Sequence, residues 1–95
     1  MPALIVFSLT IQDKQQFGEY QTAAFKTFAG VNFKMLAGPN PNATVEGEAL
    51  DEVVVLEFPT LAEAEAWYHS PGYQDAIKLR EPASKCSTFI VETKG

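Results

Sequence analysis

The residues best equipped for chemistry in this sequence gather between positions 58 and 74. Within seven residues this stretch holds two tyrosines, a tryptophan, a serine and the only histidine of the chain: Trp67, Tyr68, His69, Ser70 and Tyr73. A histidine can act as a general acid or base near neutral pH. His69 has no evident carboxylate or nucleophile partner, so two interpretations stay open: a catalytic residue, or a residue at a helix end, where the helix dipole favours an imidazolium.

Glu57 is the second candidate for catalysis. It stands in the apolar run EVVVLEF, residues 52–58, which is typical of a buried strand. A carboxylate there either reaches solvent or an ion pair at the strand end, or is held in a cleft that raises its pKa. Either Glu57 or His69 could therefore be the polar member of an active site.

Several aromatic residues could line a ligand site or simply fill the core. Trp67 and Tyr68 continue the apolar stripe of a predicted helix, and such stripes are more often core than pocket. Tyr20 lies on the apolar face of an earlier predicted helix and could place its hydroxyl between helix and sheet. We name four candidates for binding a substrate: Tyr20, Phe33, Trp67 and Tyr68.

Composition excludes several other classes of function. With 12 acidic and 7 basic residues, the net charge is −5 and no Lys or Arg cluster occurs, so nucleic acid and anionic membranes are poor partners. One histidine and one cysteine cannot complete a usual zinc set, and no glycine-rich phosphate loop precedes a helix. We expect neither metal nor cofactor. Haem binding is the one cofactor alternative that stays open. Its axial ligand would have to be His69, and a histidine at a helix end is a poor candidate for that role.

Four segments have the β-branched and aromatic composition of strands, with side chains that alternate between two faces. They are residues 3–11, 32–36, 52–58 and 85–93. The stretch AGPNPNATVEGEAL, between the second and the third, contains two prolines and two asparagines that exclude a helix. It allows a weak edge hairpin around residues 44–46.

The first helix pattern follows the first strand. Asp13 can cap it, with Gln16 three residues on in the position of a capping box. Gly30 can end it, because glycine tolerates the left-handed conformation of a helix terminator, and Val31 could then fold back on Phe25.

Two further helices are expected between the third and fourth strands. Thr60 can cap the first of them. The ring of Pro71 ends that helix and begins the next, with Ser70 as its N-cap. Pro82 ends this third helix.

The order β-α-β-β-α-β predicts an α+β domain of ferredoxin-like topology, an antiparallel sheet of four strands with helices on one face. In this topology the first and third strands are central, and those are the two that are apolar on both faces, at 4–9 and 53–58. Helices cover only one face, and 95 residues leave no other element for the second. We therefore expect a homodimer in which the helix-free faces of two copies meet.

The length of the sequence predicts one domain, residues 1–95. The apolar start MPALIVFSL lacks the basic region and cleavage site of a signal peptide and is interpreted as the first strand. No run approaches the roughly 18 apolar residues of a membrane span. We expect a cytoplasmic protein with no membrane partner.

With these elements in place, the sequence resembles the family known as domain of unknown function 1330, within the dimeric α+β barrel superfamily. The resemblance is carried by VVVLEFPTLAEAEAWYHSPGYQ, residues 53–74, and more weakly by the spacing of Asp13, Phe17 and Tyr20 and by Gly30. It covers nearly the whole chain and implies a homodimer whose two sheets face each other as a barrel. It implies no reaction. Such sequences often carry Asp or Asn where this one has His69, so a role of His69 would not be a family role.

Two classes of function are compatible with these observations. The first is a protein that binds or transforms a small apolar or aromatic metabolite in a pocket between helices and sheet. As an enzyme it would be of the cofactor-independent monooxygenase or isomerase type, by an analogy of fold within the superfamily. The second is a non-enzymatic dimeric module for structure or interaction, whose aromatic residues are only core. A cavity above roughly 300 Å³ with convergent polar groups would favour the first class.

Overall fold

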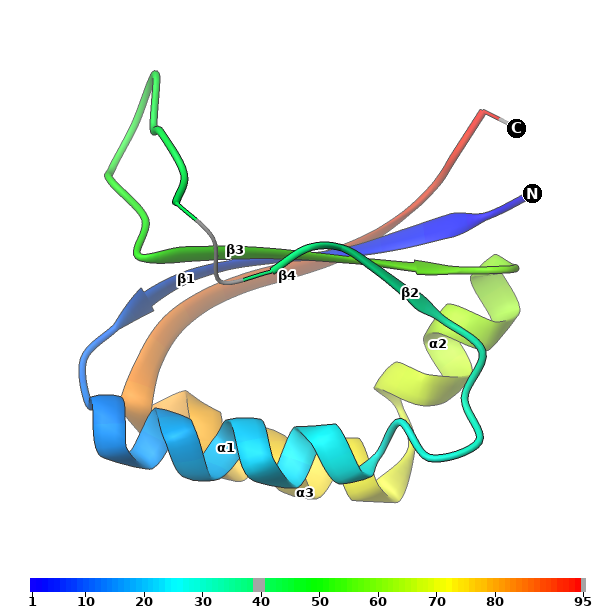
Figure 1. The fold of residues 1–95 in the computed structure, drawn as a ribbon, viewed down its shortest axis with the longest axis horizontal. Coiled ribbons are helices and arrows are strands. Elements are labelled where there is room, and N and C mark those ends of the chain that lie inside the picture. The colour runs from blue at the N-terminus through cyan, green and yellow to red at the C-terminus, as the bar shows by residue number, and fades with distance from the viewer. Residues whose placement is uncertain (39–40, 95) are drawn as a thin grey trace.

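The computed structural model describes residues 1–38 and 41–94, and within them all helices lie on one side of a four-stranded sheet (Figure 1). The elements are β1 (Ala3–Ile11), α1 (Lys14–Lys26), β2 (Lys34–Ala37), β3 (Glu52–Phe58), α2 (Leu61–Tyr68), α3 (Pro71–Arg80), the 3₁₀ turn η1 (Glu81–Ala83) and β4 (Ser84–Glu92). The strand order is β2-β3-β1-β4, and all neighbours are antiparallel. The predicted α+β fold, with the first and third strands central, is confirmed.

The core lies between the sheet and the helices. The alternation along β1 sends every second side chain into this layer, where Ile5 lies opposite Leu56 of β3. The buried residues of β1 are Ala3, Ile5, Phe7 and Leu9. The helices close the layer with aromatic rings, of which Trp67 and Tyr73 are among the most buried.

The three helices begin at their predicted caps. In each case the capping side chain accepts a hydrogen bond from the backbone N–H three residues on: Asp13 from Gln16 at 3.1 Å, Thr60 from Glu63 at 3.1 Å and Ser70 from Tyr73 at 3.4 Å. The side-chain amide of Gln16 donates to the carbonyl of Leu79, at 3.1 Å, instead of returning to Asp13. Gln16, at the N-terminal cap of α1, therefore also connects α1 to α3.

The end of α1 differs from the prediction. The hydroxyl of Thr27 donates to the carbonyl of Ala24 at 2.6 Å, and this side-chain bond caps the last turn before Gly30, whose φ is 74°. Val31 then donates its N–H to the carbonyl of Phe28, at 2.9 Å. Val31 packs against the core, whereas Phe25 is 78 % exposed.

Two predictions about strands are also corrected. The second strand runs from Lys34 to Ala37 rather than over 32–36, because Phe33 turns inward to stack on Phe28 with ring centroids 4.2 Å apart. Within residues 41–50 the chain forms no strand, so the hairpin predicted at 44–46 is wrong. This loop is closed instead by hydrogen bonds of the Asn42 and Thr44 side chains to the backbone of Leu50.

The face of the sheet without helices is apolar at its centre. β1 and β3 place half-buried aliphatic side chains there: Leu4, Val6, Val53 and Val55. β4 adds two exposed apolar side chains, Phe89 at 53 % and Val91 at 46 % exposure. The 41–50 loop rises on this side (Figure 1). A single chain therefore leaves the second face of its central strands uncovered. No helix among the described residues has the length and hydropathy to cross a membrane.

Candidate functional site

A cavity of about 270 Å³ lies between α1 and the inner face of the sheet. Most of its wall is apolar and comes from α1, β1 and β3, including Phe17, Phe7 and Leu56. Interiors are normally packed with few voids larger than a water molecule. A hollow of about 270 Å³ is therefore large for a domain of 95 residues, and it is slightly smaller than the roughly 300–1,000 Å³ of ligand pockets.

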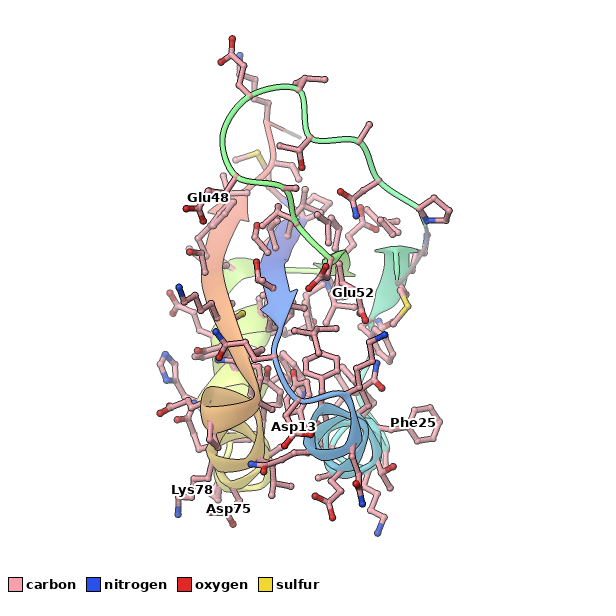
Figure 2. All side chains as sticks on the ribbon, turned by 90° about the vertical axis from the view of Figure 1, so that its left-hand side faces the viewer. Asp13, Phe25, Glu48, Glu52, Asp75 and Lys78 are labelled. Atoms are coloured by element: carbon pink, nitrogen blue, oxygen red, sulfur yellow. The ribbon has the colours of Figure 1, made fainter. Side chains whose placement is uncertain are left out.

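The cavity opens between α1 and the edge of the sheet formed by β2. α1 packs mainly against α3, and both lie under the sheet, which leaves the short edge strand without a close helical neighbour (Figure 2). Phe25 and Met35 line this opening while 78 % and 55 % exposed. Figure 2 shows the Phe25 side chain projecting sideways from α1. The mouth is thus rimmed by apolar groups that remain in water.

Two buried hydroxyl groups of the cavity wall lie together. The hydroxyls of Tyr20, from α1, and Tyr73, from α3, are 2.7 Å apart. Nη1 of Arg80 donates to the Tyr73 hydroxyl at 2.9 Å from behind. Tyr20, Tyr73 and Arg80 are 9 %, 0 % and 6 % exposed. We refer to these three residues as the tyrosine–arginine cluster.

Local sequence explains how the cluster forms. Tyr73 and Arg80 are seven residues apart on α3, two helical turns, so they lie on the same face. That face also buries Ala76 and Ile77, which pack α3 beneath the sheet. Tyr20 reaches the same point from α1 because the two helices lie side by side.

Electrostatics keeps the cluster protonated. Burial raises the pKa of Tyr73 far above its usual range, and burial also raises that of Tyr20. Both phenols are therefore neutral hydrogen-bond donors at physiological pH. The guanidinium of Arg80 stays charged, and its central carbon lies 6.0 Å from the ring centroid of Phe7 and 5.7 Å from that of Tyr20. These ring faces stabilise the cation in part.

Glu52 supplies a carboxylate to the same cavity. It is the first residue of β3 and shares the inward face with Val54 and Leu56, so it lines the cavity at the strand end that faces the viewer in Figure 2. Burial, followed by the charge of Asp51, raises the pKa of Glu52. A carboxyl with a raised pKa, close to an apolar cavity, is a suitable proton acceptor.

The four predicted substrate-binding residues separate into two groups. Tyr20 and Trp67 line the cavity, and Nε1 of Trp67 donates to the hydroxyl of Thr27 at 2.9 Å, which fixes the ring. Phe33 and Tyr68 lie outside its wall. Phe33 stacks on Phe28, and Tyr68 is half-buried beside Tyr73, with ring centroids 5.4 Å apart.

The structure does not bring the two predicted catalytic candidates into this cavity. Glu57 lies on the helix-free face, where the register places it opposite Leu4 of β1 and Lys34 of β2. His69 is exposed at the C-cap of α2, with its ring edge-on to Tyr68 at 5.2 Å. Glu57 and His69 therefore lie outside the described cavity wall and do not act together at it.

Sequence reasoning missed three residues of the site, and two of them left a signal. Arg80 falls on the buried stripe of α3, where an arginine is out of place unless it has a partner. Glu52 has the same parity along its strand as Leu56 and Phe58, which places it on the inner face. The closeness of Tyr73 to Tyr20 left no local signal, because it depends on how two helices pack.

A second hollow of about 410 Å³ lies beyond Trp67, between the turn after α1 and α2. It is larger than the first, but its hydroxyls already have partners: Ser70 donates to the carbonyl of Trp67 at 2.7 Å, and Thr27 accepts from Trp67. Its carboxylate, Glu63, is exposed. The first cavity is the better candidate because the two buried hydroxyls on its wall share one hydrogen bond, which leaves one hydroxyl proton without an acceptor among the described residues. Within residues 1–38 and 41–94, no group of three or more His, Cys, Asp or Glu residues could hold a metal ion.

Comparison with known proteins gives a family and a fold. The family model described as "Domain of unknown function (DUF1330)" matches residues 2–94. No curated protein matches the chain by sequence.

Solved structures resemble this chain in fold at low sequence identity. A protein of unknown function from Rhodopseudomonas palustris, RPA0582, has a TM-score of 0.77 at 16 % identity, over 99 % of this chain and 83 % of that one. A dimeric ferredoxin-like protein of unknown function from Jannaschia sp. CCS1 has a TM-score of 0.72 at 14 % identity, over 98 % and 100 %. SnoaB, a cofactor-independent oxygenase from Streptomyces nogalater, has a TM-score of 0.67 at 11 % identity, over 99 % and 94 %. The likenesses confirm a ferredoxin-like fold.

Proposed function

This chain belongs to the family described as domain of unknown function (DUF1330), and we propose that it binds or transforms a small apolar or aromatic metabolite in the cavity between α1 and the sheet. The observation that carries the proposal is the meeting of an apolar cavity with two buried hydroxyls, those of Tyr20 and Tyr73. Ligand sites combine a mostly apolar wall with a few placed polar groups. A module whose aromatic residues served only as core would pack this space.

The volume limits the size of the ligand. An engineered apolar cavity of roughly 150 Å³ holds one benzene molecule. The cavity of about 270 Å³ therefore suits a ligand with one ring and a short substituent, or two small rings. The open mouth beside Phe25 and Met35 lets such a ligand enter without unfolding of the helices.

A catalytic form of the proposal is of the isomerase type. Glu52 can accept a proton from a carbon next to a carbonyl, and the hydroxyl pair of Tyr20 and Tyr73 can stabilise the resulting enolate oxyanion. Glu52 would then return the same proton to a different carbon of the conjugated enolate, which completes the isomerisation. All three residues line one cavity. The solved structure of SnoaB supports a cofactor-independent reaction only by analogy of fold, at 11 % identity.

We further propose that the protein is a homodimer joined through the helix-free face. The half-buried Val6, Val53 and Val55 at the centre of that face, with exposed Phe89 and Val91, form an apolar surface in the single chain. The similar protein from Jannaschia is described as dimeric. A sheet-to-sheet contact would cover these side chains and leave the cavity, on the other side of each sheet, open.

The test of the ligand site is a pair of filling variants. Val54→Phe adds a ring that projects into the cavity, and Ala66→Phe adds the same ring at the second hollow. Single-ring probes such as nitrobenzene and benzoate should shift the amide signals of residues around the cavity in the wild type and in Ala66→Phe, and not in Val54→Phe. Binding that survives Val54→Phe and is lost in Ala66→Phe would move the site to the second hollow. If no probe binds the wild type, the ligand site is wrong and the alternative, a non-enzymatic dimeric module, is supported.

A further inference from the structure

We propose that the tyrosine–arginine cluster is an oxyanion-binding site, and that the ligand is a small aromatic or apolar molecule with one negatively charged oxygen group, a carboxylate or an enolate. The inference rests on the proposed function, because it names the class of ligand for the same cavity.

The cluster contains one more hydroxyl proton than it can use. Tyr20 and Tyr73 each have one, and the bond of 2.7 Å between their oxygens uses one of the two. Arg80 adds a further donor to the Tyr73 oxygen. Whichever tyrosine donates to the other, the remaining hydroxyl proton has no acceptor among the described residues. Both side chains line the cavity, and Tyr20 is the more exposed of the two, at 9 % against 0 % for Tyr73. When Tyr73 donates to Tyr20, a ligand in the cavity can therefore accept the proton of the Tyr20 hydroxyl.

The cluster also holds a buried positive charge without a counter-ion. The described residues contain a single ion pair, between exposed Lys78 and Asp75, so no carboxylate lies within ion-pair distance of Arg80. Nε of Arg80 is buried and has no hydrogen-bond partner in the part of the chain that the structure describes. Buried charges are normally paired, because removing an ion from water is costly. A negatively charged ligand oxygen would complete the cluster.

Arg80 acts through Tyr73 in this arrangement. It is absent from the cavity wall, so it is a positioning residue, and the Tyr20 hydroxyl is the group that contacts the ligand. Its hydrogen bond polarises the Tyr73 hydroxyl, and a polarised hydroxyl is a stronger donor. The field of the cation also favours an anion at the buried end over a neutral group.

The one carboxylate on the wall does not reverse this preference. Glu52 is half-exposed at the start of β3, whereas Tyr20 and Tyr73 are buried at the interface of α1 and α3. A ligand with an ammonium group would find only donors and a cation at the buried end. A ligand with a second anionic group would be repelled by Glu52. The arrangement therefore selects one anionic oxygen group joined to an apolar body.

The experiment compares three probes that share one ring: benzoate, its neutral isostere nitrobenzene, and benzylamine. Dissociation constants are measured by chemical-shift titration of the intact chain at pH 7.5. We expect benzoate to bind at least about tenfold more tightly than nitrobenzene, as a charge-assisted hydrogen bond in a buried site provides. Benzylamine should bind most weakly of the three.

Variants then assign this preference to the cluster. Tyr73→Phe keeps the ring and removes the hydroxyl, so the affinities for benzoate and nitrobenzene should converge, while nitrobenzene itself is unaffected. Arg80→Met should weaken benzoate in the same way. Tyr68→Phe is the matched control, because Tyr68 lies beside Tyr73 but outside the cavity wall. If Tyr73→Phe does not fold, Tyr20→Phe provides the same comparison.

Different outcomes would contradict the ligand cavity and the oxyanion site. The oxyanion site is wrong, and the ligand cavity still holds, if nitrobenzene binds the wild type but not Val54→Phe and benzoate binds the wild type no more tightly than nitrobenzene does. An anion preference that survives both Tyr73→Phe and Arg80→Met would also overturn the cluster as its cause. If none of the three probes binds the wild-type chain, the ligand cavity itself is wrong.

Discussion

The hydroxyl oxygens of Tyr20 and Tyr73 lie 2.7 Å apart, although the two residues are separated by 53 positions in the sequence. The contact joins α1 to α3 and forms part of the wall of the cavity. Arg80 approaches it from the side away from the cavity. A neutral hydrogen bond stabilises a fold by about 1 kcal/mol, whereas an unpaired buried cation costs more.

Replacing Arg80 with methionine should not destabilise the chain. Methionine fills a similar volume without a charge, and Tyr73 keeps its hydrogen bond to Tyr20. Replacement of a buried charge by an apolar side chain is often neutral or stabilising, by about 1–4 kcal/mol. We expect the free energy of unfolding, measured in urea, to stay equal to that of the wild type or to rise.

The matched control for this variant is Lys78→Met, which removes an exposed cation from the same helix. It should change the free energy of unfolding by less than about 0.5 kcal/mol. A loss above about 2 kcal/mol in Arg80→Met, absent from the control, would show that the arginine is structural.

Replacing Glu52 with glutamine should change how stability depends on pH. Burial raises the pKa of Glu52, so the folded chain binds this proton more tightly than the unfolded chain. The resulting stabilisation is fully present below the unfolded pKa of about 4.3 and is lost as the pH rises through the higher folded pKa. At pH 7 the Glu52→Gln variant should therefore melt at a higher temperature than the wild type, and the difference should shrink toward pH 4.

Glu48→Gln is the control for this comparison, because Glu48 is exposed in the 41–50 loop (Figure 2). Melting temperatures across pH 4–8 are measured for all three chains. Parallel curves for the wild type and Glu52→Gln would contradict the prediction.

A charge on the helix-free face should dissociate the proposed dimer. Val55 lies at the centre of that face, opposite Val6 of β1. An aspartate there would be buried without a partner in the dimer, at a cost of several kcal/mol, and exposed to water in the monomer. Sedimentation should give about twice the chain mass of 10.4 kDa for the wild type at micromolar concentration and a folded monomer for Val55→Asp.

The control variant is Phe25→Asp, which changes an exposed apolar residue on the helical side. It should leave the mass of the dimer unchanged. If Phe25→Asp dissociates the protein and Val55→Asp does not, the chains meet at the cavity mouth, and the proposed interface is wrong.

The sequence by itself determined the elements and their order. Apolar alternation placed β1 and β3, because side chains of a strand alternate between two faces whatever its neighbours are. Caps at Thr60 and Ser70 and the ring of Pro71 placed the ends of α2 and α3, because these signals act within one helical turn. The central position of β1 and β3 followed from their two apolar faces. These properties are local or periodic, so they can be predicted without knowing which distant segments come into contact.

Only the tertiary structure decided the site. Side chains alternate between the two faces of β3, so Glu57 lies on the helix-free face and Glu52 lies on the cavity side. The end of α2 before Pro71 leaves His69 exposed to solvent. The meeting of Tyr20 with Tyr73 requires two helices to pack side by side under the sheet, at an offset that no pattern in either helix specifies. A site of this kind is made of contacts between segments far apart in the chain. Its geometry is therefore set by the packing of whole elements rather than by the residues next to it in sequence.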